Sequence, residues 1–268
     1  MSYFTNKVVV VTGGSDGIGK ALVDALLAQG AKVATCARNY DKLYRLKTNY
    51  PDKPLLVHSA DVSKEAECKN FIQEAIDTFG TIHILINNAG VSMRALFDET
   101  SLDTLHRVMD INFWGTVYCT KYALPHIIQQ KGDVVSVSSV AGYRGLPGRT
   151  GYNASKFAMQ GFMESLRTEM LTTGVNVMWV CPGFTASNIR NAALTKDGKP
   201  QGFTPLDEGH LMSAEECAAL TLKAVEARKR TLVYTFADKR TILLNKLFPG
   251  LADKLVRNFF YKDGALAK

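Results

Sequence analysis

The sequence lacks any apolar run close to the roughly 20 residues needed to span a bilayer. It also lacks a recognisable leader, because Met1 to Lys7 is short and leads directly into a strand-like segment, so we expect no signal peptide. The five cysteines show neither a disulfide framework nor paired metal spacing, which indicates a reducing compartment and most simply the cytoplasm. They are Cys36, Cys68, Cys119, Cys181 and Cys217.

Clustered histidines, internal repeats and low-complexity linkers are absent as well. The histidines have no spacing typical of metal ligands, so we expect no metal centre. What the chain does have is 46% hydrophobic residues, which excludes a largely disordered protein, and 268 residues, enough for one domain with a substantial core. The histidines are His58, His83, His106, His126 and His210.

Short apolar, β-branched segments alternate with helical patterns along the chain. This alternation predicts a parallel sheet covered by helices on both faces. Ligands of such sheets bind beyond the carboxyl ends of the strands, so Gly13, Asn88, Ser139 and Pro182, which follow four of the segments, should converge in space. The predicted strands are residues 7–11, 32–36, 55–59, 82–86, 133–138, 175–181 and 231–235.

A glycine-rich turn follows the first predicted strand. It reads Thr12-Gly13-Gly14-Ser15-Asp16-Gly17-Ile18-Gly19 and opens an amphipathic stretch that ends at Gln29. Such a turn lets backbone amides approach a pyrophosphate at the positive end of a helix. The spacing Gly-X-X-X-Gly-X-Gly departs from the commonest dinucleotide fingerprint, and glycine can serve backbone freedom alone. Its place in the first βαβ unit favours a cofactor site.

Tyr152 and Lys156 are four residues apart, and Ser139 lies thirteen residues upstream of Tyr152. Residues four apart share one face of a helix, and a nearby cation favours the phenolate over a phenol whose pKa is ordinarily about 10. A Tyr and Lys pair alone more often covers a solvated surface. Together with Ser139 and the glycine turn, the pair predicts proton transfer during carbonyl reduction.

In their order and separation these motifs resemble the classical short-chain dehydrogenase/reductase superfamily, over about residues 7–235. The resemblance implies an α/β fold: a Rossmann-like, doubly wound, seven-stranded parallel sheet with helices on both faces, in a single domain. We expect a catalytic domain at 1–235 with a substrate loop at about 184–212, and a basic amphipathic extension at 236–268. The motifs are Thr12 to Gly19, Asn87-Asn88-Ala89-Gly90, Asn112, Ser139, Tyr152 with Lys156, and Pro182-Gly183.

The resemblance also implies the cofactor contacts. Asp61 and Val62 would hold the adenine ring, Lys156 would bridge the nicotinamide ribose hydroxyls, and Thr185 with Ser187 would fix the carboxamide. In the family a threonine is more usual where this chain has Ser187, which keeps the hydroxyl. The full implied set is Gly13, Ser15, Gly17, Ile18, Gly19, Arg38, Asp61, Val62, Asn88, Ala89, Gly90, Tyr152, Lys156, Pro182, Gly183, Thr185 and Ser187.

Cofactor choice can be argued from the end of the second predicted strand. An acidic residue there would bind a ribose 2′-hydroxyl and favour NAD, but this chain has Ala37 and Arg38. A guanidinium grips a phosphate through paired hydrogen bonds, so we expect NADP(H). The alternative is that Arg38 only begins a solvated turn, and Asp16 weakens the prediction because some NADP-dependent relatives have a basic residue there.

The mechanism implied by the resemblance uses Asn112, Ser139, Tyr152 and Lys156. Ser139 and Tyr152 would hold a ketone oxygen while hydride reaches the carbonyl carbon, and Tyr152 would give its proton to the developing alkoxide. In the reverse direction Tyr152 is the base, with a pKa lowered by Lys156. The carbonyl group of Asn112 would hold a water that relays protons to Lys156, and the alternative role of Asn112 is to kink its helix.

Positive charge gathers at the C-terminus. From Lys223 onward, eleven Lys or Arg face four Asp or Glu, and the difference of +7 equals the net charge of the whole chain. Leu251, Leu255 and Phe259 recur at helical spacing, and Pro249 should separate two short helices. Three interpretations stay open: a helix docked on its own domain or on a partner subunit, a helix at an anionic membrane surface, or a helix whose apolar residues contact a lipid substrate.

This tail, with the Asp197-Gly198-Lys199 insert, resembles the branch of microsomal hydroxysteroid dehydrogenases and acyl-dihydroxyacetone-phosphate reductases, with 3-ketosphinganine reductases as neighbours. The branch implies a lipid-like or steroid-like ketone. The superfamily also implies a homodimer or homotetramer through the segments Ser101 to Gln130 and Tyr152 to Leu171. We expect no nucleic-acid binding, because no recognised module accompanies the basic tail. The alternatives are a non-catalytic NADP-binding regulator and an NAD-dependent alcohol dehydrogenase of a small polar substrate.

Overall fold

A seven-stranded parallel sheet forms the centre of the protein, whose computed structural model describes residues 2–204 and 211–267. The strand order β3-β2-β1-β4-β5-β6-β7 reverses direction between β1 and β4, as in a doubly wound fold. The predicted strands are all present, with ends shifted by at most two residues. They are β1 (Val8–Thr12), β2 (Lys32–Ala37), β3 (Leu55–Ser59), β4 (Ile84–Asn87), β5 (Asp133–Val137), β6 (Asn176–Cys181) and β7 (Thr231–Val233).

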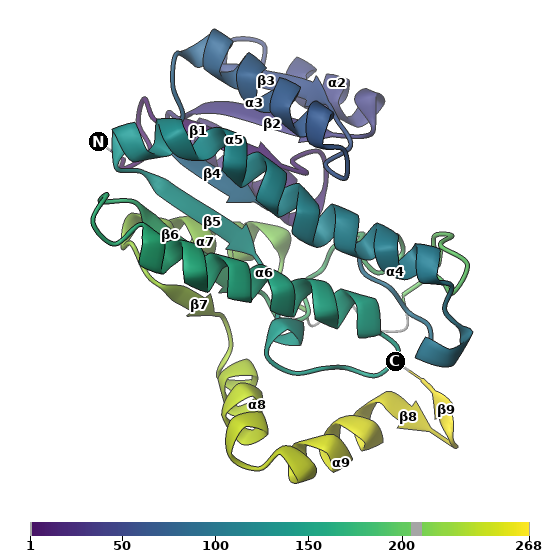
Figure 1. The fold of residues 1–268 in the computed structure, drawn as a ribbon. Coiled ribbons are helices and arrows are strands. Elements are labelled where there is room, and N and C mark those ends of the chain that lie inside the picture. Colours follow the sequence, from purple (N-terminus) through teal and green to yellow (C-terminus); the bar gives the residue numbers. More distant parts are fainter. Residues whose placement is uncertain (1, 205–210, 268) are drawn as a thin grey trace.

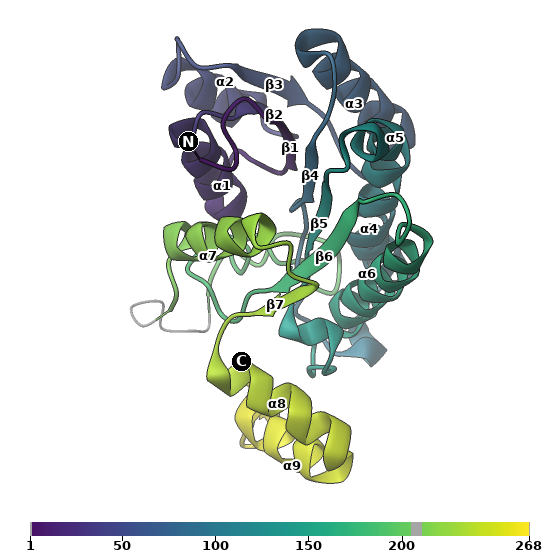
Figure 2. The same ribbon diagram turned by 90° about the vertical axis from the view of Figure 1, so that its left-hand side faces the viewer.

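Helices cover both faces of the sheet, and Figure 2 shows the two layers on either side of the strands. One face holds α1 (Gly17–Ala28), α2 (Tyr40–Thr48) and α7 (Ala214–Glu226). The other holds α3 (Glu65–Phe79), α5 (Gly115–Gln130) and α6 (Thr150–Glu169). The short helix α4 (Leu102–Met109) continues into α5 through a π-helical turn, Asp110–Trp114.

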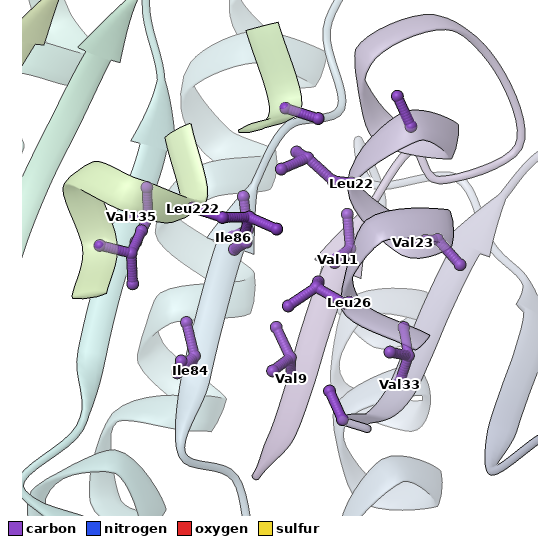
Figure 3. Close-up of a cluster of buried hydrophobic side chains, with 14 of the residues drawn as sticks. Val9, Val11, Leu22, Val23, Leu26, Val33, Ile84, Ile86, Val135 and Leu222 are labelled. Atoms are coloured by element: carbon purple, nitrogen blue, oxygen red, sulfur yellow. The ribbon is translucent and has the colours of Figure 1, made fainter. Parts of the chain in front are cut away.

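The core explains why the strands read as continuous apolar runs. On the first face, Val9 and Val11 of β1 pack against Leu22 and Leu26 of α1 and Leu222 of α7, and all five are at most 2% exposed (Figure 3). Strands buried on both faces need apolar side chains at every position. Burying one such side chain contributes about 1.5–3 kcal/mol, so the strand ends, where polar residues follow, are held by a stable core.

The last part of the chain leaves the sheet after β7 and forms what we call the C-terminal hairpin, residues 236–267 (Figure 1). It comprises α8 (Phe236–Leu247), α9 (Pro249–Phe260) and the two-stranded β8 (Tyr261–Lys262) and β9 (Ala265–Leu266). Pro249 separates the helices, as predicted. No helix in the described residues is both long and apolar enough to traverse a bilayer.

Polar contacts attach the C-terminal hairpin to the loop after β5. The Arg144 guanidinium donates to Asn245 at 2.9 Å and pairs with Asp253 at 2.6 Å. Further along, Arg94 donates to the carbonyl oxygen of Leu266 at 3.1 Å. The hairpin is therefore docked on its own domain, as in the first interpretation of the tail.

Candidate active site

A large cavity opens at the carboxyl ends of the central strands, where the sequence placed the ligand site. Its volume is about 820 Å³, and its lining extends from Arg38, just after β2, to Tyr152 on α6. Every residue predicted to contact the cofactor lines this cavity, and so does Ser139. Of the predicted site residues only Asn112 lies behind the wall.

The glycine turn between β1 and α1 has no room for side chains. Gly13 has φ 71°, and a Cβ there would lie 2.9 Å from the Cα of Ala89. A Cβ on Gly19 would lie 2.1 Å from the carbonyl oxygen of Gly13. The Asn88 side-chain amide donates to the Thr12 carbonyl oxygen at 2.9 Å and fastens the turn to the end of β4. Bare backbone at the N-terminus of α1 thus faces the cavity, as phosphate binding requires.

Two cations lie near the end of β2. Arg38 is exposed, and among the described residues it has no ion pair. Lys42 on α2, which the sequence analysis did not single out, pairs with Asp16 at 2.5 Å, and both side chains are about half exposed. The charge of Asp16, which weakened the prediction of NADP(H), is therefore offset. Asp61 accepts hydrogen bonds from the Ser63 amide and hydroxyl at 3.0 and 2.8 Å.

Ser139 and Tyr152 meet at the other end of the cavity. Ser139 follows β5, and its Oγ accepts a hydrogen bond from the Ala141 amide at 3.1 Å, which fixes the side chain. Tyr152 lies in the first turn of α6 and is 8% exposed. Burial raises the pKa of Tyr152, while its hydrogen bond with Ser139 and the charge of Arg149 oppose that rise. The phenol is therefore protonated near neutral pH and can donate its proton.

Lys156 lies one turn after Tyr152 on the same face of α6, as the spacing predicted. Its Nζ is 5.7 Å from the centroid of the Tyr152 ring and donates to the Val137 carbonyl oxygen at 2.8 Å. Burial lowers the pKa of Lys156 to about 8. The charge of Arg149 also lowers the pKa of Tyr152. The effect of Lys156 on that pKa stays a prediction.

Asn112 sits in the π-helical turn and is fully buried. Its Oδ1 accepts from the Val91 amide at 2.8 Å, and its Nδ2 donates to the Val91 carbonyl oxygen and to Ser155 Oγ, both at 2.9 Å. The side chain thereby fixes a cavity-lining segment against α6. Its main-chain carbonyl accepts from Thr116 Oγ1 at 3.0 Å. The proton relay through Asn112 stays a prediction beside this positioning contact.

The segment after β6 crosses the cavity towards the glycine turn. Thr185 is 4% exposed, and its hydroxyl donates to the Gly183 carbonyl oxygen at 3.4 Å. A Cβ on Gly17 would lie 3.3 Å from the Cβ of Ser187, so this segment closes over the turn. Residues 205–210, within the predicted substrate loop, lie outside the described residues, and so does His210.

Two contributors to the site were missed from the sequence, and a third, the C-terminal extension, was one of several open possibilities. Gln160 donates to Ser138 Oγ at 2.8 Å and ties α6 to the end of β5. Arg149 lines the cavity and is 9% exposed. The C-terminal hairpin also lines the cavity, through residues that include Leu255 and Phe259. Periodicity revealed the amphipathic helix but not the surface it covers, and no spacing rule marks a single arginine before a helix.

The fold and the arrangement of the cavity together define an oxidoreductase with a dinucleotide site. A family model described as short chain dehydrogenase matches residues 7–198. The chain therefore belongs to the short-chain dehydrogenase family, whose members use a nicotinamide cofactor.

The relatives include vertebrate proteins similar over most of the chain. Mouse dehydrogenase/reductase SDR family member 7B is 33% identical over 271 residues, covering 98% of this chain and 84% of the mouse protein. Human dehydrogenase/reductase SDR family member 7 is 39% identical over 230 residues, covering 81% of this chain and 67% of the human protein. A Burkholderia phymatum short-chain dehydrogenase/reductase solved with NAD has a TM-score of 0.84 at 24% identity, covering 94% of this chain and 96% of that one. At 24% identity, the similarity to the bacterial structure shows the fold alone.

The residues of the cavity fit a nicotinamide dinucleotide. Positions 13 and 19 accept only glycine, which leaves the backbone open to a pyrophosphate. A cavity of about 820 Å³ is within the range that encloses a ligand of drug or cofactor size. The described residues contain no group of three or more His, Cys, Asp or Glu side chains that could hold a metal ion.

Proposed function

We propose that the protein interconverts a ketone and a secondary alcohol with NADP(H), and that the ketone is lipid-like or steroid-like. The observation that carries the proposal is that Ser139 and the buried Tyr152 line the cavity that also contains the glycine turn. A phenol held protonated by burial, beside a hydroxyl and a buried lysine, is suited to protonating an alkoxide.

The chain's own residues would divide the work as follows. Backbone from Gly13 to Gly19 would hold the pyrophosphate, and Lys156 would hold the nicotinamide ribose. The cofactor, once bound, supplies the hydride. Ser139 donates a hydrogen bond to the ketone oxygen, and Tyr152 Oη donates a second bond and then its proton as charge develops on that oxygen. Because burial raises the pKa of Tyr152, the proton is in place for reduction near neutral pH.

NADP(H) is favoured over NAD(H) by charge at the end of β2. Arg38 is available to a 2′-phosphate, and Lys42, which lines the same part of the cavity, offsets the charge of Asp16. Asp61 is the only carboxylate of the predicted adenine contacts, and two hydrogen bonds from Ser63 already occupy one of its oxygens.

An apolar substrate is favoured by the C-terminal hairpin. Leu244, Leu255, Val256 and Phe259 line the cavity, so one wall beyond the catalytic pair is aliphatic and aromatic. Such a wall suits an acyl chain or a steroid ring system. Reductases of acyl-dihydroxyacetone phosphate or of 3-ketosphinganine are the types that this site would resemble.

Two surface properties complete the proposal. Trp114 and Phe157, on the helical face that we expect to form a homodimer or homotetramer, are 42% and 47% exposed. On the C-terminal hairpin, Leu247, Phe248 and Leu251 are 50–60% exposed, beside several lysines and arginines. We propose that this second surface makes a peripheral contact with an anionic membrane.

A panel of ketones tests the reaction and the cofactor together. Absorbance of NADPH would be followed with short and long aliphatic 2-ketones, a 3-ketosteroid, a 3-ketosphingoid base and an acyl-dihydroxyacetone phosphate, and the panel repeated with NADH. We expect turnover with NADPH to exceed that with NADH at least tenfold and to rise with chain length. Turnover of none of these ketones would refute the proposal.

A further inference from the structure

Arg149 is a buried cation whose environment the catalytic scheme does not explain. It precedes α6 directly, three residues before Tyr152, and is 9% exposed. A guanidinium keeps its charge in proteins, and burying a charge is costly unless a partner compensates it.

The described residues do not provide that partner. The Arg149 Nη1 lies 3.5 Å from the hydroxyl of Ser92, which is long for a charged hydrogen bond. Its Nε is buried and has no hydrogen-bond partner. Burial lowers the pKa of Arg149, and the charges of Arg94 and Arg190 lower it further, while Tyr152 is the one opposing group within the described parts of the chain. Among the described residues, no carboxylate is therefore among the groups that act on this guanidinium.

Of residues 2–204 and 211–267, the carboxylates that line the cavity are engaged elsewhere. Asp16 pairs with Lys42. Asp61 binds Ser63. Asp238 accepts from the Thr235 hydroxyl at 2.7 Å at the start of α8. The first turn of α6, which follows Arg149, contains no acidic residue and has no side-chain cap, so the positive end of this helix adds to the same field.

We propose that Arg149 binds an anionic oxygen group of the substrate, a phosphate or a carboxylate, close to the carbonyl that Ser139 and Tyr152 hold. The inference rests on the proposed function and narrows its substrate. Arg149 and Tyr152 line one cavity, and the apolar wall of the C-terminal hairpin lines it too. The cavity then suits an amphiphile with a charged head, a ketone next to it and an apolar remainder. Charge-assisted hydrogen bonds to such a head would compensate the buried guanidinium.

Three ketones of matched chain length test the inference: 2-oxododecyl phosphate, 4-oxododecanoate and the neutral 1-hydroxydodecan-2-one. The readout is the ratio of kcat/KM between an anionic ketone and the neutral one, because loss of Arg149 also affects Tyr152 and lowers both values. We expect a ratio of roughly ten to a hundred for one or both anions, because a hydrogen bond to a charged group contributes about that much. The difference between the ketones should lie mainly in KM. Which anion is preferred distinguishes a phosphate from a carboxylate head.

Arg149→Met should bring the ratio to within about twofold of one, and Arg149→Lys should retain part of it, because charge persists without the planar fork. The matched control is Arg45→Met, which removes an exposed arginine of α2 outside the cavity and should leave the ratio unchanged. NADPH binding by each variant checks that it is folded.

Two results would overturn the inference while leaving the proposed function intact. One is a wild-type ratio near one, a measurement that needs no variant. The other is an unchanged ratio in Arg149→Met, with all three ketones slowed equally, which would mean that Arg149 serves only the pKa of Tyr152. Absence of turnover with every ketone would instead refute the proposed function itself.

Discussion

The sheet domain and the C-terminal hairpin line the same cavity but are stabilised in different ways. On α6, Tyr152 and Lys156 are buried among residues that pack on the sheet. In the hairpin, α8 has no fully buried residue, and α9 has two, Ala252 and Phe260. Polar contacts such as those of Arg144 complete the attachment. The residues proposed for chemistry thus lie in the extensively buried sheet domain, which we call the rigid part. The residues proposed for substrate selection lie in the C-terminal hairpin, which buries few of its residues.

The largest effect should come from the rigid part. Tyr152→Phe removes the proton donor and leaves the ring, so kcat should fall by roughly 10²–10⁴-fold, the contribution of general acid catalysis. The dissociation constant for NADPH should change less than twofold, because the phenol is a minor cofactor contact. Steady-state kinetics and fluorescence titration measure the two quantities. Near-normal turnover would exclude Tyr152 as the acid.

The burial of Lys156 predicts a second effect on the rigid part, this time on stability. Its pKa falls from 10.5 to about 8 in the folded protein, so below pH 8 the fold bears the cost of a buried charge, at most about 3 kcal/mol by linkage. Between pH 8 and 10.5 the folded protein releases this proton before the unfolded chain does, and the wild type gains stability as pH rises. Lys156→Met should therefore be more stable than the wild type at pH 7, with the difference vanishing near pH 10.5.

Urea unfolding of the two proteins from pH 7 to 10 measures this difference. The matched control is Lys121→Met, which replaces an exposed lysine of α5 and should show no such convergence. A variant that is less stable than the wild type at pH 7 would mean that the bond from Lys156 to the Val137 carbonyl outweighs the cost of burial.

Arg38 should show an intermediate effect. Arg38→Ala should raise the dissociation constant for NADPH about ten- to a hundredfold, because a hydrogen bond to a charged group contributes roughly 1.5–3 kcal/mol. The constant for NADH, which has no 2′-phosphate, should barely change. Calorimetry with NADPH and with NADH measures the two dissociation constants. Equal binding of NADPH and NADH by the wild type would show that the end of β2 does not select the cofactor.

The smallest effect should come from the C-terminal hairpin, and it should depend on the substrate. Leu255 and Phe259 line the cavity, and replacing both with serine should raise KM for a long-chain ketone about tenfold, as expected for losing one to two kcal/mol of apolar contact. A short ketone should be affected less than twofold.

A second pair of substitutions in the hairpin separates substrate binding from membrane binding. Leu247 and Leu251 are exposed but do not line the cavity, so Leu247→Ser with Leu251→Ser should leave KM unchanged and weaken binding to vesicles containing phosphatidylserine. Uniform loss of activity in either pair, with a large fall in Tm, would show that the hairpin is a structural part of the domain.

The sequence was sufficient for the fold and for most of the candidate site. Strands buried on both faces have a strong apolar signal, and residues that follow strand ends converge in any sheet of this type. Gly13, Asn88, Ser139 and Pro182 could therefore be placed together without coordinates. Arg149 could not be assigned to the site from the sequence, because its proposed role follows from the lack of a carboxylate partner among the residues that the structure describes. Which surface the tail covers also depends on contacts between segments about a hundred residues apart, such as Arg144 with Asn245, and no local pattern encodes them.

Helices α4 and α5 form one continuous helical segment, and the π-helical turn Asp110–Trp114 between them sets the rotation of α4 about the helix axis relative to α5. Each residue in an α-helix rotates the following side chains by about 100°, so the wider turn changes which way α4 faces relative to α5. One half packs on α6 beside the cavity, and the other packs on α3 and the sheet. Deleting a single residue in this turn would rotate α4 relative to α5. Then either α4 could pack on α6 or α5 could pack on α3 and the sheet, but not both.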